Sequence, residues 1–148
     1  MPLNRAMNFM NDRAFVDTNI LVYAHDSATG HKHLKANQLV RQLWKSGTAV
    51  LSTQVLQELC VNLQRKCAKV PSNEEIRSIL KDYSGWLVVT HSAVSIIEAF
   101  EMQLRWKLSF WDALILQAAE SAGCDVVFSE DFEPNRRFGN LRIVNPLL

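Results

Sequence analysis

Short apolar runs alternate along this chain with longer segments of helical periodicity, and this alternation limits the folds open to it. Helix-forming segments separate most of the apolar runs, which occupy residues 14–16, 49–51, 86–89, 126–128 and 141–144. Strands this short and this uniformly apolar are typical of a sheet that is covered on both faces. Helical connections between neighbouring strands require those strands to run parallel. The sequence therefore predicts the α/β class, as a three-layer α/β/α sandwich with a short, mainly parallel central sheet.

The helix-forming segments begin and end at recognisable signals. Their apolar residues recur at helical spacing, and small polar residues precede several of them as N-caps. We expect one short helix directly after Asp17 and longer helices that begin near residues 33, 53, 73, 92 and 109. Gly47 and Gly123 stand where they would end two of these helices.

The length of 148 residues is that of one domain with a substantial core. We expect residues 1–13 to form a flexible N-terminal leader and residues 14–148 to form a single domain. The leader lacks the apolar segment of a signal peptide, and no run in the chain approaches the roughly 20 apolar residues of a membrane span. The three cysteines form no C-x-x-C pair and fit reduced thiols. These features favour a cytoplasmic protein.

The charges of the chain are balanced, because 16 lysines and arginines stand against 15 aspartates and glutamates. A formal net charge of +1 excludes a protein that binds nucleic acid through its bulk charge. Any nucleic-acid site would have to depend on basic residues that gather locally.

Two aspartates follow directly on predicted strands. Asp17 comes after residues 14–16, and Asp131 lies two residues past Ser129, which itself follows residues 126–128. In a parallel sheet the carboxyl ends of the strands meet at one edge, where ligands bind. We therefore expect Asp17 and Asp131 to lie at the same edge, although turn formation alone would explain one of them.

Two further acids lie on predicted helices. Glu58 falls on the border of the apolar stripe of its helix, so it points toward the body of the protein or snorkels to solvent. Asp112 stands at S-x-x-D spacing from Ser109, which fits a capping box. The apolar neighbours of Asp112 also favour a semi-buried carboxylate, and such a group needs a partner or a metal ion.

Metal binding explains these four carboxylates together. Converging carboxylates repel one another unless a cation joins them. Oxygen ligands without thiolate or imidazole suit Mg²⁺ or Mn²⁺, and such an ion activates water and offsets charge on a phosphoryl group. Asn19 and Ser129 would orient the ligands. Glu130 stays open as the fourth ligand in place of Asp131, although an extended segment would turn it the other way.

These residues resemble the PIN-domain family and, within it, the VapC-like ribonuclease toxins. The resemblance covers nearly the whole chain and rests on residues 15–23, 52–58, 108–113, 128–132 and 141–146. It implies a PIN-like nuclease domain with a Mg²⁺ or Mn²⁺ cofactor, a homodimer and inhibition by a cognate antitoxin. The family often has threonine where Ser129 stands, and serine keeps the hydroxyl. The catalytic metal ligands that the resemblance implies, with support from Asn19 and Ser129, are Asp17, Glu58, Asp112 and Asp131.

The function that follows is metal-dependent cleavage of single-stranded RNA by the toxin of a type II toxin–antitoxin pair. An acidic site repels RNA, so cations must line its approach. Trp106 and Trp111 are expected to pack in the core, although one of them could stack on a base. The cationic candidates, several of which also suit the dipole at a helix end, are Arg65, Lys66, Lys69, Arg105, Lys107, Arg136 and Arg137.

Three other functions stay open. A phosphohydrolase of small phosphate esters could use the same acidic edge, but the haloacid-dehalogenase type needs a second aspartate where this chain has Asn19. A phosphoacceptor receiver domain needs a lysine at a late strand end, where this chain has Ser129-Glu130-Asp131. A non-catalytic binding module would not require all four carboxylates.

The partner surface of the predicted homodimer also has a candidate in the sequence. The segment from Leu34 to Trp44 is rich in large apolar residues. Apolar residues gathered on a surface usually mark a binding site. We therefore expect this segment to supply contacts to a partner.

Overall fold

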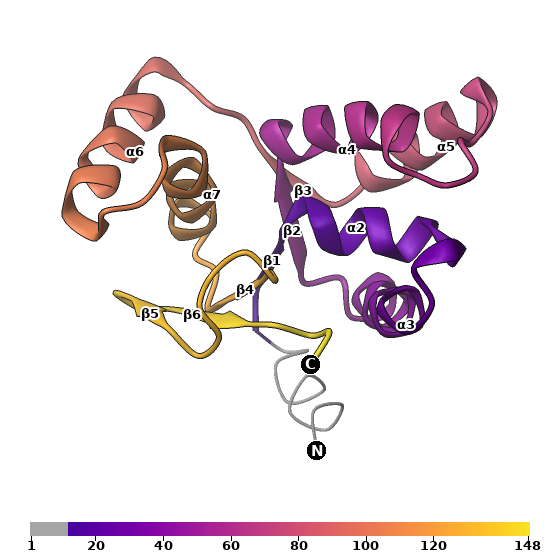
Figure 1. The fold of residues 1–148 in the computed structure, drawn as a ribbon. Helices are drawn as coiled ribbons and strands as arrows, with labels where there is room; N and C mark the ends of the chain where they lie inside the picture. The colour runs from indigo at the N-terminus through magenta and orange to yellow at the C-terminus, as the bar shows by residue number, and fades with distance from the viewer. Residues whose placement is uncertain (1–11) are drawn as a thin grey trace.

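The computed structural model, which describes residues 12–148, has a six-stranded sheet at its centre (Figure 1). The strand order is β3-β2-β1-β4-β6-β5. Every neighbouring pair is parallel except β5 with β6. The prediction of a short, mainly parallel sheet is therefore confirmed. The strands are β1 (Ala14–Val16), β2 (Ala49–Ser52), β3 (Leu87–Val89), β4 (Val126–Phe128), β5 (Arg137–Phe138) and β6 (Leu141–Val144).

Helices cover both faces of the sheet, which confirms the three-layer prediction (Figure 1). Four helices lie on one face: α2 (Thr18–His25), α3 (His31–Ser46), α4 (Thr53–Arg65) and α5 (Asn73–Tyr83). A short 3₁₀ turn, η1 (Ser27–Thr29), joins the first two of these. The other face carries α6 (Ala93–Trp106) and α7 (Phe110–Ser121).

The antiparallel pair of β5 and β6 is absent from the sequence prediction. Phe138 pairs with Leu141, so Gly139 and Asn140 form the two-residue turn of a hairpin. Gly139 has a φ of +61°, a left-handed conformation that glycine adopts without strain. A Gly-Asn pair between short apolar runs is a hairpin signal, and it was present in the sequence.

The core fixes the ends of β1 and β4. Phe15, Val16, Val127 and Phe128 are all fully buried. The helix α7, which is buried over most of its circumference, lies on one side of these strands and α2 lies on the other (Figure 1). Burial of each such large side chain contributes about 1.5 to 3 kcal/mol. The carboxyl ends of these two strands are therefore held in place by packing.

The predicted leader, residues 1–13, lies outside the described residues except for Asp12 and Arg13. Nη1 of Arg13 donates a hydrogen bond to the carbonyl oxygen of Ala122 at 2.9 Å. The carbonyl oxygen of Arg13 accepts one from the amide of Asp125, also at 2.9 Å. Arg13, the last residue of the predicted leader, is therefore hydrogen-bonded to the domain. Within residues 12–148, no helix is both long and apolar enough to cross a membrane.

The segment from Leu34 to Trp44 is amphipathic, and its prediction as a contact surface was wrong for three of its five large apolar residues. Leu39, Val40 and Leu43 are buried, whereas Leu34 and Trp44 are exposed. The amphipathic helix α3 turns its apolar side toward the interior. Its apolar composition therefore did not show which side chains are exposed. Large apolar side chains are exposed on α6 instead, at Val94, Ile96, Ile97, Phe100 and Leu104.

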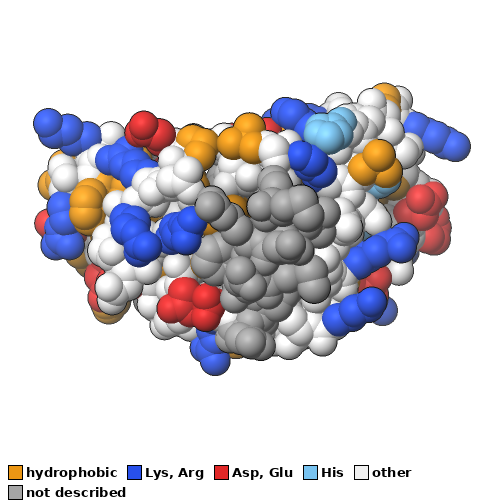
Figure 2. Space-filling model, turned by 90° about the horizontal axis from the view of Figure 1, so that it is seen from below, with side chains coloured by type: hydrophobic (Ala, Val, Ile, Leu, Met, Phe, Trp, Pro, Cys, Tyr) orange, Lys and Arg blue, Asp and Glu red, His pale blue; other side chains and the backbone are white. Residues whose placement is uncertain are grey.

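The charges on the surface are mixed, as the net charge of the chain suggests. On the face shown in Figure 2, basic side chains lie around the rim with acidic ones among them. Neither sign forms one continuous patch over that face.

Candidate active site

Asp17 lies at the carboxyl end of β1 and caps α2. Aspartate is a favoured N-cap residue because its carboxylate accepts hydrogen bonds from free amides of the first turn. Here Oδ1 accepts a hydrogen bond from the amide of Thr18 at 2.8 Å. Oδ2 accepts a second one from Oγ of Ser129 at 2.7 Å. The side chain is only 6% exposed, so a carboxylate is fixed in the interior at the edge of the sheet.

Asp131 is brought to the same edge because β1 and β4 are parallel neighbours. Its carboxylate accepts two hydrogen bonds from Nδ2 of Asn19, at 3.0 and 2.9 Å. Its backbone amide donates to Oγ of Ser129 at 3.1 Å. Ser129 therefore contacts both acids, and the structure brings Asp17, Asn19, Ser129 and Asp131 together as the topology argument expects.

Glu58 and Asp112 approach this edge on helices from opposite faces of the sheet. Glu58 lies on α4 and is exposed, whereas Asp112 lies in the first turn of α7 and is half-buried. The amide of Asp112 donates to Oγ of Ser109 at 3.1 Å, so Ser109 caps α7. The described contacts of Asp112 do not include the reciprocal bond of a capping box, which Glu75 does make with Ser72 in α5. The Asp112 carboxylate is thus not used by the cap.

One hydrogen bond links the two helices near the acids. Nε2 of Gln54, in the first turn of α4, donates to the backbone carbonyl of Trp111 at 3.4 Å. Trp111 immediately precedes Asp112, and Gln54 lies one turn before Glu58. The helix starts that carry these two acids are therefore adjacent.

The electrostatics of the four carboxylates show that they share one region. Burial raises the pKa of Asp17 to about 7, and the charges of Asp131 and Glu58 raise it further. Hydrogen bonds from Ser129 and Thr18 act in the opposite direction and lower this pKa. Desolvation, then the charges of Asp131 and Asp112, raise the pKa of Glu58. Desolvation raises the pKa of Asp131, and so do the negative charges of Glu130 and Asp112. The hydrogen bond from Asn19 and the positive charge of Lys66 lower it. Within residues 12–148, no lysine or arginine forms an ion pair with Asp17.

These residues fit a hard divalent cation for two reasons: their donor atoms are oxygens, and the Asp17 carboxylate is buried without an ion-pair partner within residues 12–148. A buried carboxylate without a cationic partner is costly, and a metal ion would offset that cost. Carboxylate, hydroxyl and amide oxygens suit Mg²⁺ or Mn²⁺. As the side chains lie, no three acid, imidazole or thiol groups in the described part of the chain are close enough to hold an ion together. The edge therefore has the composition of a metal site without its full coordination geometry.

Glu130, the alternative fourth ligand, points to a different set of partners. Oε1 accepts a hydrogen bond from Oη of Tyr23, and Oε2 forms an ion pair with Nζ of Lys32 at 3.1 Å. Neither Tyr23 nor Lys32 was singled out from the sequence. Glu130 and Tyr23 are 107 residues apart, and no local pattern relates them.

The two tryptophans near Asp112 differ in their surroundings. Trp106 packs edge to face on Phe138, with ring centroids 5.3 Å apart, as expected for a core residue. Trp111 is 65% exposed, so the prediction of a core role for it was wrong. The buried side of α7 begins with Ala113 and Leu114, and Trp111 does not belong to it. A large aromatic surface is left in solvent beside a candidate acidic site.

The basic candidates differ in whether they lie near the acidic edge. Lys66, at the C-cap of α4, lies near enough to Asp131 for its charge to lower the pKa of that acid. Arg136 lies over the ring of Phe138, 4.5 Å from the centroid. The structure describes no contact between the acidic edge and Arg65, Lys69, Arg105, Lys107 or Arg137.

A mainly parallel sheet lies between two helical layers, and Asp17 and Asp131 lie at its carboxyl edge. The family model of the PIN domain matches residues 14–138, and the chain belongs to this family. The predicted family resemblance is thereby confirmed.

One solved structure shows how far the fold extends. VapC20 of Mycobacterium tuberculosis, a toxin that cleaves the sarcin–ricin loop, is similar to this chain with a TM-score of 0.62 and 23% sequence identity. The match covers 80% of this chain and 91% of that one. At this identity the likeness shows a common fold. A comparison with curated proteins finds no match.

The raised pKa of Asp17 predicts a pH-dependent stability of the metal-free protein. An unfolded aspartate has a pKa of about 3.9, so between about pH 4 and 7 the folded state binds more protons at this site. Stability should therefore decrease as pH rises through that range and level off above it. Thermal melting without metal should give a smaller decrease for Asp17→Asn, which keeps a capping side chain, and an unchanged one for the exposed control Asp125→Asn. A steeper decrease in Asp17→Asn would contradict this account.

Proposed function

We propose that this protein is a metal-dependent endoribonuclease that cleaves single-stranded RNA. The observation that carries the proposal is the buried carboxylate of Asp17 at the sheet edge, which forms no ion pair within residues 12–148. Asp131 and Glu58 are near enough for their charges to raise its pKa. Membership of the PIN domain family supports nuclease chemistry at that edge. The absence of imidazole and thiol donors from the acid cluster supports a hard cation rather than zinc.

The residues of the site have separate tasks in this proposal. Asp17, Glu58, Asp112 and Asp131 would hold Mg²⁺ or Mn²⁺. When bound, the ion supplies activation of water and stabilisation of charge on the phosphoryl group. Ser129 holds Asp17 through its hydroxyl, and Asn19 holds Asp131 through its amide. These two polar residues restrict the rotation of both acids and so prepare them for the ion.

The RNA side of the site is supported by one cation and one aromatic ring. The acidic edge repels a phosphate backbone, so binding requires positive charge nearby. Lys66 is the basic residue whose charge reaches Asp131. Trp111 offers an exposed ring one residue before Asp112, and a single-stranded base stacks well on such a surface.

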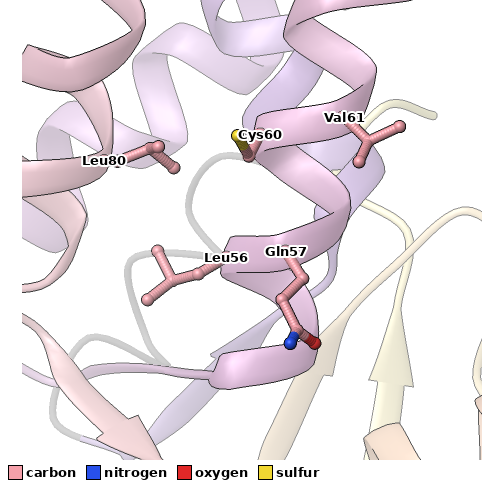
Figure 3. A pocket seen from close by; sticks show the side chains of 5 residues that line it. All are labelled: Leu56, Gln57, Cys60, Val61 and Leu80. Carbon is pink, nitrogen blue, oxygen red and sulfur yellow. The ribbon is translucent and has the colours of Figure 1, made fainter.

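The similarity to VapC20 supports a finer proposal, that the protein is the toxin of a type II toxin–antitoxin pair in the cytoplasm. A cognate antitoxin would place a basic side chain at the acidic edge and lay an apolar helix against the toxin. An apolar depression that could take such a helix lies between α4 and α5 (Figure 3). Its lining consists of Leu56, Gln57, Cys60 and Val61 of α4 and Leu80 of α5.

The first test of the function is cleavage of a mixed RNA pool with Mg²⁺ or Mn²⁺ and then with EDTA. We expect cleavage with either ion and none with EDTA. Asp17→Asn should lose at least about 100-fold in rate, and Ser129→Ala about 10- to 100-fold, since Ser129 acts through Asp17. Asp125→Asn, which removes a carboxylate outside the acidic edge, is the matched control. Cleavage that persists in EDTA would exclude the metal mechanism.

Metal binding has a thermal readout that does not depend on cleavage. Free Mg²⁺ at ten times its dissociation constant should stabilise the wild-type fold by roughly 1.4 kcal/mol, or about 3–6 °C in melting temperature. Asp17→Asn removes a repelling charge and a ligand, so at neutral pH it should melt higher without metal and shift less with Mg²⁺. A lower metal-free melting temperature with an unchanged shift would make Asp17 a structural residue.

A stacking role for Trp111 predicts a specific loss in the use of RNA. Stacking of a base on an aromatic ring contributes about 1 to 3 kcal/mol, so Trp111→Ala should lower kcat/KM for RNA about 5- to 150-fold. Trp111→Phe should keep most of the rate because it keeps a ring. Neither variant should change the melting temperature by more than about 2 °C, since the side chain is exposed. The control is Leu34→Ala, which truncates an equally exposed apolar residue on α3. Equal losses for Trp111→Phe and Trp111→Ala would exclude stacking.

We further propose a homodimer in which α6 lies against the same helix of a second copy. Its exposed apolar residues exceed the scattered ones that a monomer tolerates, and a two-fold axis lets one patch cover itself. Sizing chromatography at tens of micromolar should give a dimer for the wild type and a monomer for Phe100→Glu. Leu34→Glu should stay dimeric. A monomeric wild type, or a dimeric Phe100→Glu, would exclude this interface.

A further inference from the structure

Three successive residues after β4 are each bonded to a different residue of the first helical segment. Ser129 donates to Asp17, the N-cap of α2. Asp131 accepts from Asn19 in the first turn, and Glu130 accepts from Tyr23 in the last turn. The first two contacts belong to the acidic edge already described. The third has no partner among the four candidate metal ligands, and its role is open.

Both carboxylate oxygens of Glu130 are occupied. Oη of Tyr23 donates to Oε1, and Nζ of Lys32 donates to Oε2 at 3.1 Å. Nζ of Lys32 also lies 3.4 Å from Oη of Tyr23 and 4.9 Å from the centroid of the tyrosine ring. The three side chains therefore contact one another pairwise, and we refer to Tyr23, Lys32 and Glu130 as the clamp.

The clamp affects Asp131 through the backbone, because Glu130 and Asp131 are consecutive residues. Asp131 is exposed, and its described contacts are the amide of Asn19 and the hydroxyl of Ser129. Residues 130–132 form a bend just after β4, and one peptide joins Glu130 to Asp131. Contacts that hold Glu130 therefore also restrict the backbone from which the Asp131 side chain projects. Without the clamp, the Asn19 amide would have to hold an exposed carboxylate against rotation of the whole turn.

We propose that Glu130, held by Tyr23 and Lys32, is a positioning residue that keeps Asp131 turned toward the metal. The inference rests on the proposed function of the acidic edge. Glu130 acts only through Asp131, so its amide analogue, which keeps the length and an acceptor oxygen, should replace it in large part. Tyr23 should matter through its hydroxyl alone.

The test uses the full chain and Mn²⁺ alone as the probe, with Mn²⁺ affinity measured by electron paramagnetic resonance. Tyr23→Phe and Glu130→Ala should each weaken Mn²⁺ binding about 10-fold, the range found for groups that orient metal ligands. Glu130→Gln should recover most of the affinity. The double variant should be no weaker than Glu130→Ala, because both changes break the same contact. The control is Glu133→Ala, which removes an equal charge from an exposed position in the same loop.

Cleavage of RNA is the second readout, and melting is the third. Tyr23→Phe should lower kcat with KM for RNA unchanged, since the clamp is proposed to act through Asp131 and the metal alone. The proposal is overturned if Tyr23→Phe changes the melting temperature alone, which would make the clamp structural. It is also overturned if Glu130→Gln binds Mn²⁺ as poorly as Asp131→Asn, which would make Glu130 a ligand. Wild-type protein that binds Mn²⁺ but cleaves no RNA would contradict the proposed function and leave this inference standing.

Discussion

The hydrogen bond from Ser129 to the buried carboxylate of Asp17 is the contact on which the acidic edge depends. It joins the end of β4 to the end of β1, and the cap of α2 adds the amide of Thr18 to the same carboxylate. Because β1 and β4 are fully buried, the positions of both residues follow from the packing of the core. Asp17 and Ser129 are therefore held at the edge by the packing of the strands that precede them.

Burial of the Asp17 carboxylate makes the edge costly for the fold. Two donors are not enough to offset the desolvation of Asp17, whose pKa stays raised to about 7. A domain selected for stability alone would place a neutral residue there or pair the acid with a cation. A group kept at such a cost is more often functional than structural. This is the physical reason for reading the edge as an active site, independent of family membership.

The sequence predicted the parts of the site that follow from strand topology and missed those that depend on long-range contacts. Asp17 and Asp131 could be placed together because each ends a strand of a parallel sheet, where side chains must meet. The β5–β6 hairpin had a signal in Gly139-Asn140 that the helix-and-strand pattern obscured. The contact of Tyr23 with Glu130 had none, since only the folded chain brings residues 107 apart into reach. The exposure of Trp111 was equally hidden, because periodicity gives the apolar side of a helix but not its neighbours.

The acids of the edge are held in two different ways, and this difference bears on how a metal would act. Asp17 is held by a hydrogen bond from Ser129, directly after β4, and Asp131 by hydrogen bonds from Asn19, in the first turn of α2. Side-chain hydrogen bonds from Gln54 and Thr18 lower the pKa of Glu58, whereas the described contacts of the Asp112 carboxylate include no side-chain bond. These two acids come from α4 and α7 on opposite faces. Apart from helix packing, the bond between Gln54 and the Trp111 carbonyl is what ties these helix starts together. A cation among the four acids would therefore connect the two helical layers across the end of the sheet.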